Sequence, residues 1–152
     1  MPSTRQLAAI LFTDIVGYSA LMQQDEHSAI RLVKHHRVVL KNTVAEHEGD
    51  VIDYYGDGSL CIFTSITEAM QCAFSIQKQL REDPVVPLRI GLHIGEVVFE
   101  DGKIMGDGVN IASRIQSLGR AGSILFSKEV FDKIRSHTEF QSVYLGKFSL
   151  KN

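Results

Sequence analysis

Residues 51–63, with the sequence VIDYYGDGSLCIF, decide which fold this chain can adopt. Residues 51–55 and 59–63 contain β-branched and aromatic side chains, and the tight turn Gly56-Asp57-Gly58 separates them. A short glycine-containing turn between two such runs predicts a β-hairpin. The hairpin gives two adjacent antiparallel strands, and the elements on either side of it determine the kind of sheet they belong to.

A helix and a strand are expected on each side of the hairpin. Apolar residues recur at helical spacing across residues 25–48, and a capping box at residues 65–68 opens a second apolar stripe. The apolar run at residues 7–12 predicts a buried strand, and residues 88–99 predict a long one. The resulting order, β-α-β-β-α-β, is that of a ferredoxin-like sheet with its helices on one face.

Further elements follow this six-element core. Residues 107–118 predict a helix, residues 123–126 a strand and residues 128–135 a short helix. Residues 140–150 alternate weakly between apolar and polar side chains, and we expect them to form the last strand pair. The expected fold class is therefore α+β, with a ferredoxin-like βαββαβ core and extra C-terminal elements.

The composition is typical of a single globular domain. Of 152 residues, 44% are hydrophobic, which is enough for a core and too many for a disordered chain. The net charge of −2 argues against nucleic-acid binding driven by bulk charge. The N-terminus has no apolar leader and no run approaches the roughly 20 residues of a membrane span, so we expect a cytoplasmic location. The two cysteines are expected to be reduced, and His35 and His36 to lie on a solvated helix face.

Two acidic residues are candidates for metal binding. Asp14 follows the first predicted strand, where it either caps a helix or, beside unpaired helix amides, holds a cation that binds phosphate. Asp57 lies in the hairpin turn, which a purely structural role also explains. In a ferredoxin-like sheet the first strand lies beside the hairpin, so Asp14 and Asp57 would converge at one edge. Paired carboxylates of this kind suit two Mg²⁺ ions.

A third candidate segment lies on the predicted helix that begins near residue 107. Asn110 and Arg114 are four residues apart and therefore share a helix face. Asn both donates and accepts hydrogen bonds, and Arg presents a planar set of donors to phosphate. The structural alternative is an exposed helix face or a locally capped Asn. The small residues Ala112 and Ser113 favour close approach by a partner.

Four segments together resemble the catalytic domain of the class III nucleotidyl cyclases, the adenylate and guanylate cyclases. They are FTDIVGYS at residues 12–19, YGDGS at 55–59, RIGLHIGEV at 89–97 and MGDGVNIASR at 105–114. Each motif is weak alone, but the four in this order and at these spacings are specific. The resemblance runs from about residue 6 to residue 151, and it implies a domain that acts as a dimer with sites at the subunit interface.

The resemblance implies a role for each matching residue. Asp14 and Asp57 would bind two Mg²⁺ (or Mn²⁺) ions, assisted by the backbone carbonyl of Ile15. From the other subunit, Asn110 would orient the ribose and Arg114 would stabilise charge on the reacting phosphate. The remaining phosphate contacts are assigned to Arg89, Lys151 and the backbone amides of Ile15, Val16, Gly17, Tyr18 and Ser19.

The implied reaction converts a nucleoside triphosphate into its 3′,5′-cyclic nucleotide and pyrophosphate. All site positions occur in this one chain, so a homodimer would build two complete sites. We expect ATP as the substrate; the alternatives are GTP, a pyrimidine nucleotide, or a catalytically weak nucleotide-binding regulatory module. We expect no nucleic-acid partner and no membrane segment in this chain. Residues 1–152 are expected to be one catalytic domain that lacks its last strand, with regulatory domains elsewhere in a longer protein.

The base-reading positions depart from the adenylate cyclase pattern. Such enzymes usually carry a Lys four residues before the second metal Asp, and an Asp or Thr seven residues before the Asn. These places hold Asp53 and Lys103 here, and an acid at the first place resembles the guanylate cyclase arrangement. Either the two side chains contact the base, in which case we expect them to lie near each other, or they form a simple salt bridge. A shorter loop before Gly106 would remove Lys103 from this position altogether.

Overall fold

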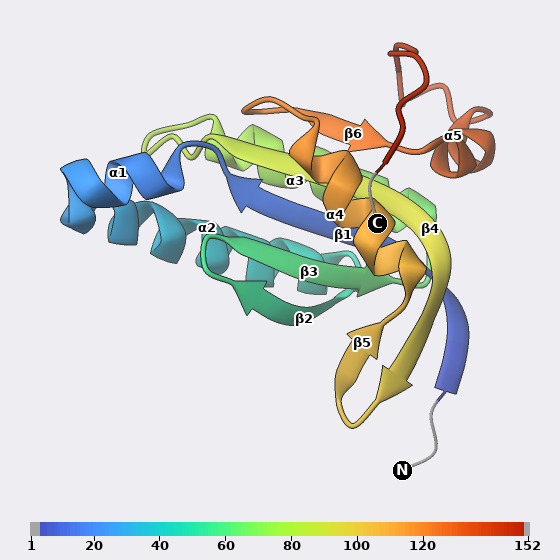
Figure 1. Ribbon diagram of the computed structural model, residues 1–152. Coiled ribbons are helices and arrows are strands. Elements are labelled where there is room, and N and C mark those ends of the chain that lie inside the picture. Colours follow the sequence, from blue (N-terminus) through green and yellow to red (C-terminus); the bar gives the residue numbers. More distant parts are fainter. Residues whose placement is uncertain (1–3, 151–152) are drawn as a thin grey trace.

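The predicted hairpin is present as β2 (Asp50–Tyr55) and β3 (Gly58–Phe63) in the computed structural model, which describes residues 4–150. β3 pairs antiparallel with β1 (Thr4–Ile15), and β1 pairs antiparallel with β4 (Leu88–Glu100). The strand order β2-β3-β1-β4 is that of the expected ferredoxin-like core (Figure 1). The α+β fold class is therefore confirmed.

Helices cover both faces of this sheet. α2 (Glu26–Glu46) and α3 (Ile66–Leu80) lie behind it in Figure 1, and α4 (Asp107–Ser117) crosses in front. The larger apolar core lies between the sheet and the helices α2 and α3. A smaller one, which includes Ala112, lies beneath α4. The predicted capping box is confirmed, because the Ser65 hydroxyl accepts a hydrogen bond from the Glu68 N–H. Among the described residues, no helix is both long enough and apolar enough to cross a membrane.

Several elements differ from the expected boundaries. β1 is longer than the apolar run from which it was predicted, because it pairs with β4 along its whole length. The sequence indicated a helix entrance after Asp14 but not a separate short helix α1 (Tyr18–Gln24), and it did not predict β5 (Lys103–Met105). β5 forms a hairpin with β4 through Asp101 and Gly102, both at positive φ, and is too short to produce a visible alternation.

The expected strand pair over residues 140–150 is wrong. After β6 (Ile124–Phe126), which pairs parallel with β4, and α5 (Lys128–Ile134), the described chain has no regular secondary structure. Phe140 stacks on Phe74 of α3, with ring centroids 5.7 Å apart. Beyond Phe140 the large apolar side chains of Val143, Tyr144, Leu145 and Phe148 are exposed, because weak alternation does not produce a face that the core can bury.

Two glycines of β4 allow the backbone of α4 to lie directly against the sheet. A Cβ on Gly91 would come within 2.5 Å of the backbone nitrogen of Gln116, and a Cβ on Gly95 would lie 3.2 Å from the Cα of Gly108. Larger side chains at these positions would push the helix away from the strand. The glycines in this long β run therefore set the position of α4.

A buried polar network joins α2 to the sheet. The Thr13 hydroxyl lies 2.6 Å from the Ser59 hydroxyl and 3.3 Å from Nε2 of His36. All three residues are buried, so the expectation of a solvated His36 is wrong, although His35 is only half-buried. Burial lowers the pKa of His36 to about 4, because the charged imidazolium would lose its hydration, and the charges of neighbouring residues act in the same direction.

The buried His36 predicts a loss of stability in acid. Its folded-state pKa of about 4 lies below the ordinary value of 6.5, so between these values the unfolded chain binds a proton that the folded protein does not. The contribution of neutral His36 to the free energy of unfolding is fully present above pH 6.5 and is lost as the pH falls toward 4. The loss amounts to about 3 kcal/mol, because each unit of pKa difference corresponds to about 1.4 kcal/mol. When the pH is lowered from 6.5 to 4, the free energy of unfolding should therefore fall less in His36→Leu than in the unmodified chain. Urea unfolding measures this, and equal losses in the two proteins would contradict the assignment.

Candidate active site

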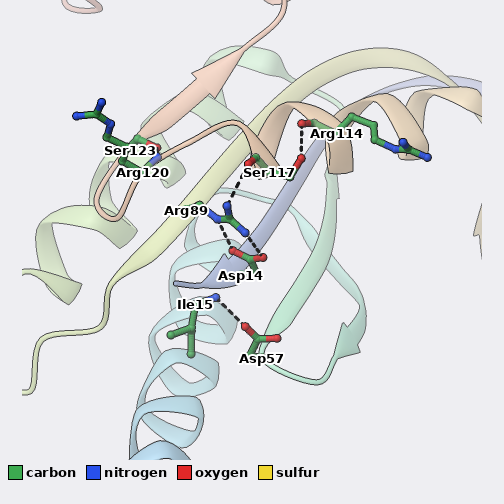
Figure 2. Close-up of polar contacts among 8 residues, drawn as sticks. All are labelled: Asp14, Ile15, Asp57, Arg89, Arg114, Ser117, Arg120 and Ser123. Carbon is green, nitrogen blue, oxygen red and sulfur yellow. Dashed lines mark hydrogen bonds and ion pairs between the residues drawn. The ribbon is translucent and has the colours of Figure 1, made fainter. Parts of the chain in front are cut away.

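The ends of three strands meet at one end of the sheet. Asp14, next to last in β1, lies directly opposite Arg89 of β4 in the antiparallel register. Asp57 lies in the turn before β3, and its Oδ2 accepts a hydrogen bond of 3.2 Å from the Ile15 N–H (Figure 2). A Cβ placed on Gly58 would lie 3.3 Å from the Cβ of Asp14, so the hairpin turn contacts the end of β1. The structure thus brings Asp14 and Asp57 to the same place, as the topology predicted.

Arg89 binds both oxygens of the Asp14 carboxylate. Its Nε donates to Oδ1 at 2.8 Å and its Nη2 to Oδ2 at 2.7 Å, while Nη1 donates to the carbonyl of Ser117 at 3.0 Å (Figure 2). The hydrogen bonds to Asp14 raise the pKa of Arg89; burial opposes this, and the charges of Asp14 and Asp57 support it. The guanidinium therefore stays ionised and links β1, β4 and the end of α4. Sequence reasoning missed this link, because it depends on where α4 ends.

Two of the predicted phosphate-binding amides, at the end of β1 and in the loop after it, already have partners within the chain. The Ile15 N–H binds Asp57, and the Val16 N–H donates to the Pro87 carbonyl at 2.8 Å. Gly17, at φ 75°, turns the chain into α1, whose first residues are Tyr18 and Ser19. The loop is thus tied to the hairpin on one side and to the segment before β4 on the other.

Asn110 and Arg114 lie on α4, and among the described residues no hydrogen bond or ion pair joins either side chain to the two carboxylates. Asn110 is exposed, Arg114 is half-buried, and the Arg114 side chain points away from Asp14 and Arg89 in Figure 2. Within residues 4–150, neither side chain forms a hydrogen bond. A single chain therefore does not combine these side chains with its own acidic pair. Lys151, the last predicted contact, lies outside the described residues.

Asp53 and Lys103 are not brought together within one chain. They lie on β2 and β5, the two outer strands of the path β2-β3-β1-β4-β5, and no ion pair joins them in the part of the chain that the structure describes. Asp53 pairs with Leu60 and so faces the α4 side of the sheet, where its Oδ1 accepts a hydrogen bond from the Tyr54 N–H. Lys103 lies on the opposite side of β5 from Ile104, which packs beneath α4.

The donors at the acidic pair suit a hard divalent cation. The two carboxylates and the Ile15 carbonyl offer only oxygen, which Mg²⁺ and Mn²⁺ prefer. Among the described residues, no group of three or more His, Cys, Asp or Glu side chains converges. A divalent ion here would complete its shell with water and substrate oxygens, as Mg²⁺ commonly does. The residues present therefore fit Mg²⁺ or Mn²⁺ bound together with a phosphorylated ligand.

Comparisons with known proteins agree on one family. A family model described as the adenylate and guanylate cyclase catalytic domain matches residues 2–152. A putative adenylate cyclase 3 from Rhizobium meliloti is 37% identical over 97% of this chain and 27% of its own length, so the chain spans about a quarter of that relative. The crystal structure of an adenylate/guanylate cyclase/hydrolase from Silicibacter pomeroyi has a TM-score of 0.92 at 32% identity and covers 99% of this chain and 92% of its own. The adenylyl cyclase CyaB from P. aeruginosa shares the fold at 21% identity, with a TM-score of 0.78 over 90% of this chain and 84% of its own.

Proposed function

The chain belongs to the adenylate and guanylate cyclase catalytic domain family, and we propose that it converts ATP into 3′,5′-cyclic AMP and pyrophosphate at sites shared between two copies of itself. The observation that carries this proposal is the convergence of Asp14 and Asp57 at one end of the sheet, beside the loop that leads into α1. An acidic pair next to a helix entrance is an arrangement suited to a metal-bound triphosphate.

The acidic pair would hold two divalent ions. Asp14 and Asp57, with the Ile15 carbonyl, are the proposed ligands for Mg²⁺ or Mn²⁺. When bound, such ions neutralise charge on the phosphates and lower the pKa of the ribose 3′-hydroxyl. The protein's own part is to hold the two carboxylates in place. The Ile15 N–H contributes to this by binding Asp57.

Other groups of the same chain would bind the triphosphate. Because the amides of Ile15 and Val16 have protein partners, we assign the cradle mainly to the amides of Gly17, Tyr18 and Ser19 at the start of α1. The Arg89 guanidinium would bind the terminal phosphates, since its planar donors match phosphate oxygens. Lys151 is proposed for the same phosphates on the basis of the motif match.

A second copy of the chain would complete each site. Asn110 is exposed and the Arg114 side chain points away from Asp14 and Arg89 in Figure 2, so we assign both to a partner's substrate and not to their own chain's acidic pair. Asn110 would fix the ribose so that the 3′ oxygen is in line with the α-phosphate. Arg114 would stabilise the charge that develops on the α-phosphate as pyrophosphate leaves.

The choice of ATP rests on a relative, and Asp53 is the residue that tests it. The Rhizobium relative at 37% identity is named as a putative adenylate cyclase. Asp53 faces the α4 side of the sheet and is an acceptor for a base N–H, such as adenine N6–H or guanine N1–H. Lys103 lies on the other side of its strand, so Asp53 is the stronger of the two proposed base contacts.

Removing either carboxylate should abolish turnover. Asp14→Ala and Asp57→Ala each delete a proposed metal ligand, so cyclic nucleotide should fall to background in assays with ATP, GTP, UTP and CTP under Mg²⁺ and Mn²⁺. Asp132→Ala, which removes an exposed carboxylate on α5, is the control and should keep the normal rate. Circular dichroism checks that each variant is folded. A near-normal rate in either variant would overturn the metal assignment, and nucleotide binding without product in the unmodified chain would favour a regulatory module.

Mixing two inactive variants should restore activity if the site is shared. Asp57→Ala and Arg114→Ala fail in different halves of the site, so a mixed dimer has one intact site. About half of randomly formed dimers are mixed, with one of two sites whole, so recovery should approach about a quarter of the unmodified rate. Product formation is measured after subunit exchange has been demonstrated. No recovery after exchange would show that both residues act within one chain.

Asp53 should control the choice between bases. Asp53→Ala removes a hydrogen-bond acceptor that substrate binding would bury. The loss of such a hydrogen bond costs about 1–3 kcal/mol, so discrimination between ATP and GTP should fall by about 5- to 150-fold. The metal requirement should stay the same. Asp50→Ala, at the exposed start of the same strand, is the matched control. An unchanged ratio of kcat/KM for ATP and GTP would exclude Asp53 from base recognition.

A further inference from the structure

Arg89 covers the carboxylate that the proposed function gives to a metal ion. Two of its nitrogens donate to the two oxygens of Asp14 at 2.8 and 2.7 Å, so one planar group occupies both oxygens. Figure 2 shows the guanidinium between Asp14 and the last turn of α4. Both oxygens of the proposed metal ligand thus already accept a hydrogen bond inside the protein.

Secondary structure holds this ion pair in place. Asp14 and Arg89 are direct partners in the β1–β4 register, so their side chains leave the sheet on the same face. The third guanidinium contact is the carbonyl of Ser117, the last residue of α4, where helix carbonyls lack intrahelical partners. The Arg89 and Asp14 side chains are only 23% and 27% exposed, so water screens the pair less than it would at the surface.

A cation and the guanidinium compete for this carboxylate, because the hydrogen bonds of Arg89 take up one lone pair on each of its two oxygens. A cation bound by Asp14 needs at least one of its oxygens, and both carry a hydrogen bond from Arg89. Since the two groups have charge of the same sign, a bound cation also repels the guanidinium. Phosphate is the other group whose oxygens match the planar donors of an arginine.

We propose that Arg89 is an exchangeable counter-ion that excludes free divalent metal from Asp14 until a triphosphate draws it away. This inference rests on the proposed function and gives Arg89 a role besides phosphate contact. In the self-paired arrangement Arg89 lowers the affinity of the acidic pair for metal alone. When a triphosphate binds Arg89, Asp14 becomes available, so metal and triphosphate bind together more readily than either does alone.

The test is a titration of the nucleotide-free full chain with Mn²⁺, in which the electron paramagnetic resonance signal reports free Mn²⁺. Arg89→Gln removes the competing charge and should tighten Mn²⁺ binding by about tenfold or more. Arg89→Lys keeps the charge but cannot cover both oxygens, so it should tighten binding by a smaller factor. Arg120→Gln removes the charge of a side chain that points away from the acidic pair in Figure 2, and it should bind Mn²⁺ as the unmodified chain does.

Asp57→Asn separates failure of this inference from failure of the proposed function. If Asp57→Asn abolishes Mn²⁺ binding but Arg89→Gln binds no more tightly than the unmodified chain, the metal site stands and the role of Arg89 is overturned. If Arg89→Gln binds Mn²⁺ more tightly but Arg89→Lys binds it as the unmodified chain does, the role of Arg89 is also overturned. Charge repulsion alone would then explain the weak binding of metal. If Asp57→Asn leaves Mn²⁺ binding unchanged, or the unmodified chain and Arg89→Gln both bind none, the proposed metal site fails and the inference fails with it.

Discussion

The antiparallel pairing of β1 with both β3 and β4 is the constraint on which the candidate site depends. In this register Thr13 lies opposite Ser59 on one side and Ile90 on the other, and the next residue, Asp14, lies opposite Arg89. Because side chains alternate between the two faces of a strand, a slip of one residue would move Asp14 to the α2 side of the sheet. The buried hydroxyls of Thr13 and Ser59 oppose such a slip, since their hydrogen bond and the contact with His36 would be lost. A polar network one residue away from Asp14 thus fixes the direction in which its carboxylate points.

The close approach of α4 to β4 connects the two halves of the proposed site. Gly91 allows the backbone of Gln116 to lie against the strand, and the neighbouring carbonyl of Ser117 then reaches Arg89. The same helix carries Asn110, which is exposed, and Arg114, whose side chain points away from Asp14 in Figure 2. One element therefore contributes the backbone carbonyl that accepts from Arg89, the partner of Asp14, and it also carries the two polar side chains that we assign to a partner's substrate.

Local patterns predicted most of the fold, but contacts between distant strands limited what could be predicted of the site. The hairpin, the capping box at Ser65 and the stripes of α2 and α3 follow from nearby residues, and their order was enough to bring Asp14 and Asp57 together. The Asp14–Arg89 pair joins residues 75 positions apart, and only the register of β1 and β4 places them opposite each other. His36 looked like part of a charged helix face, because its buried partner Thr13 comes from another element. Asp53 and Lys103 matched positions in linear motifs, yet the sheet order places them on opposite outer strands.

The acidic pair poses an electrostatic problem that the fold must solve before any ligand binds. Two carboxylates at one end of a sheet repel each other, and burial of either one without a partner is unfavourable. Each has a partner within the same chain: Arg89 binds both oxygens of Asp14, and the Ile15 N–H binds Asp57. These contacts stabilise the pair in the folded chain, but Arg89 also competes with a divalent ion for the oxygens of Asp14. A site that is stable alone and can also bind metal therefore needs a carboxylate partner that can move away. An arginine meets this requirement, because a phosphate can bind its guanidinium in place of the carboxylate. A second backbone N–H, fixed in position, would not.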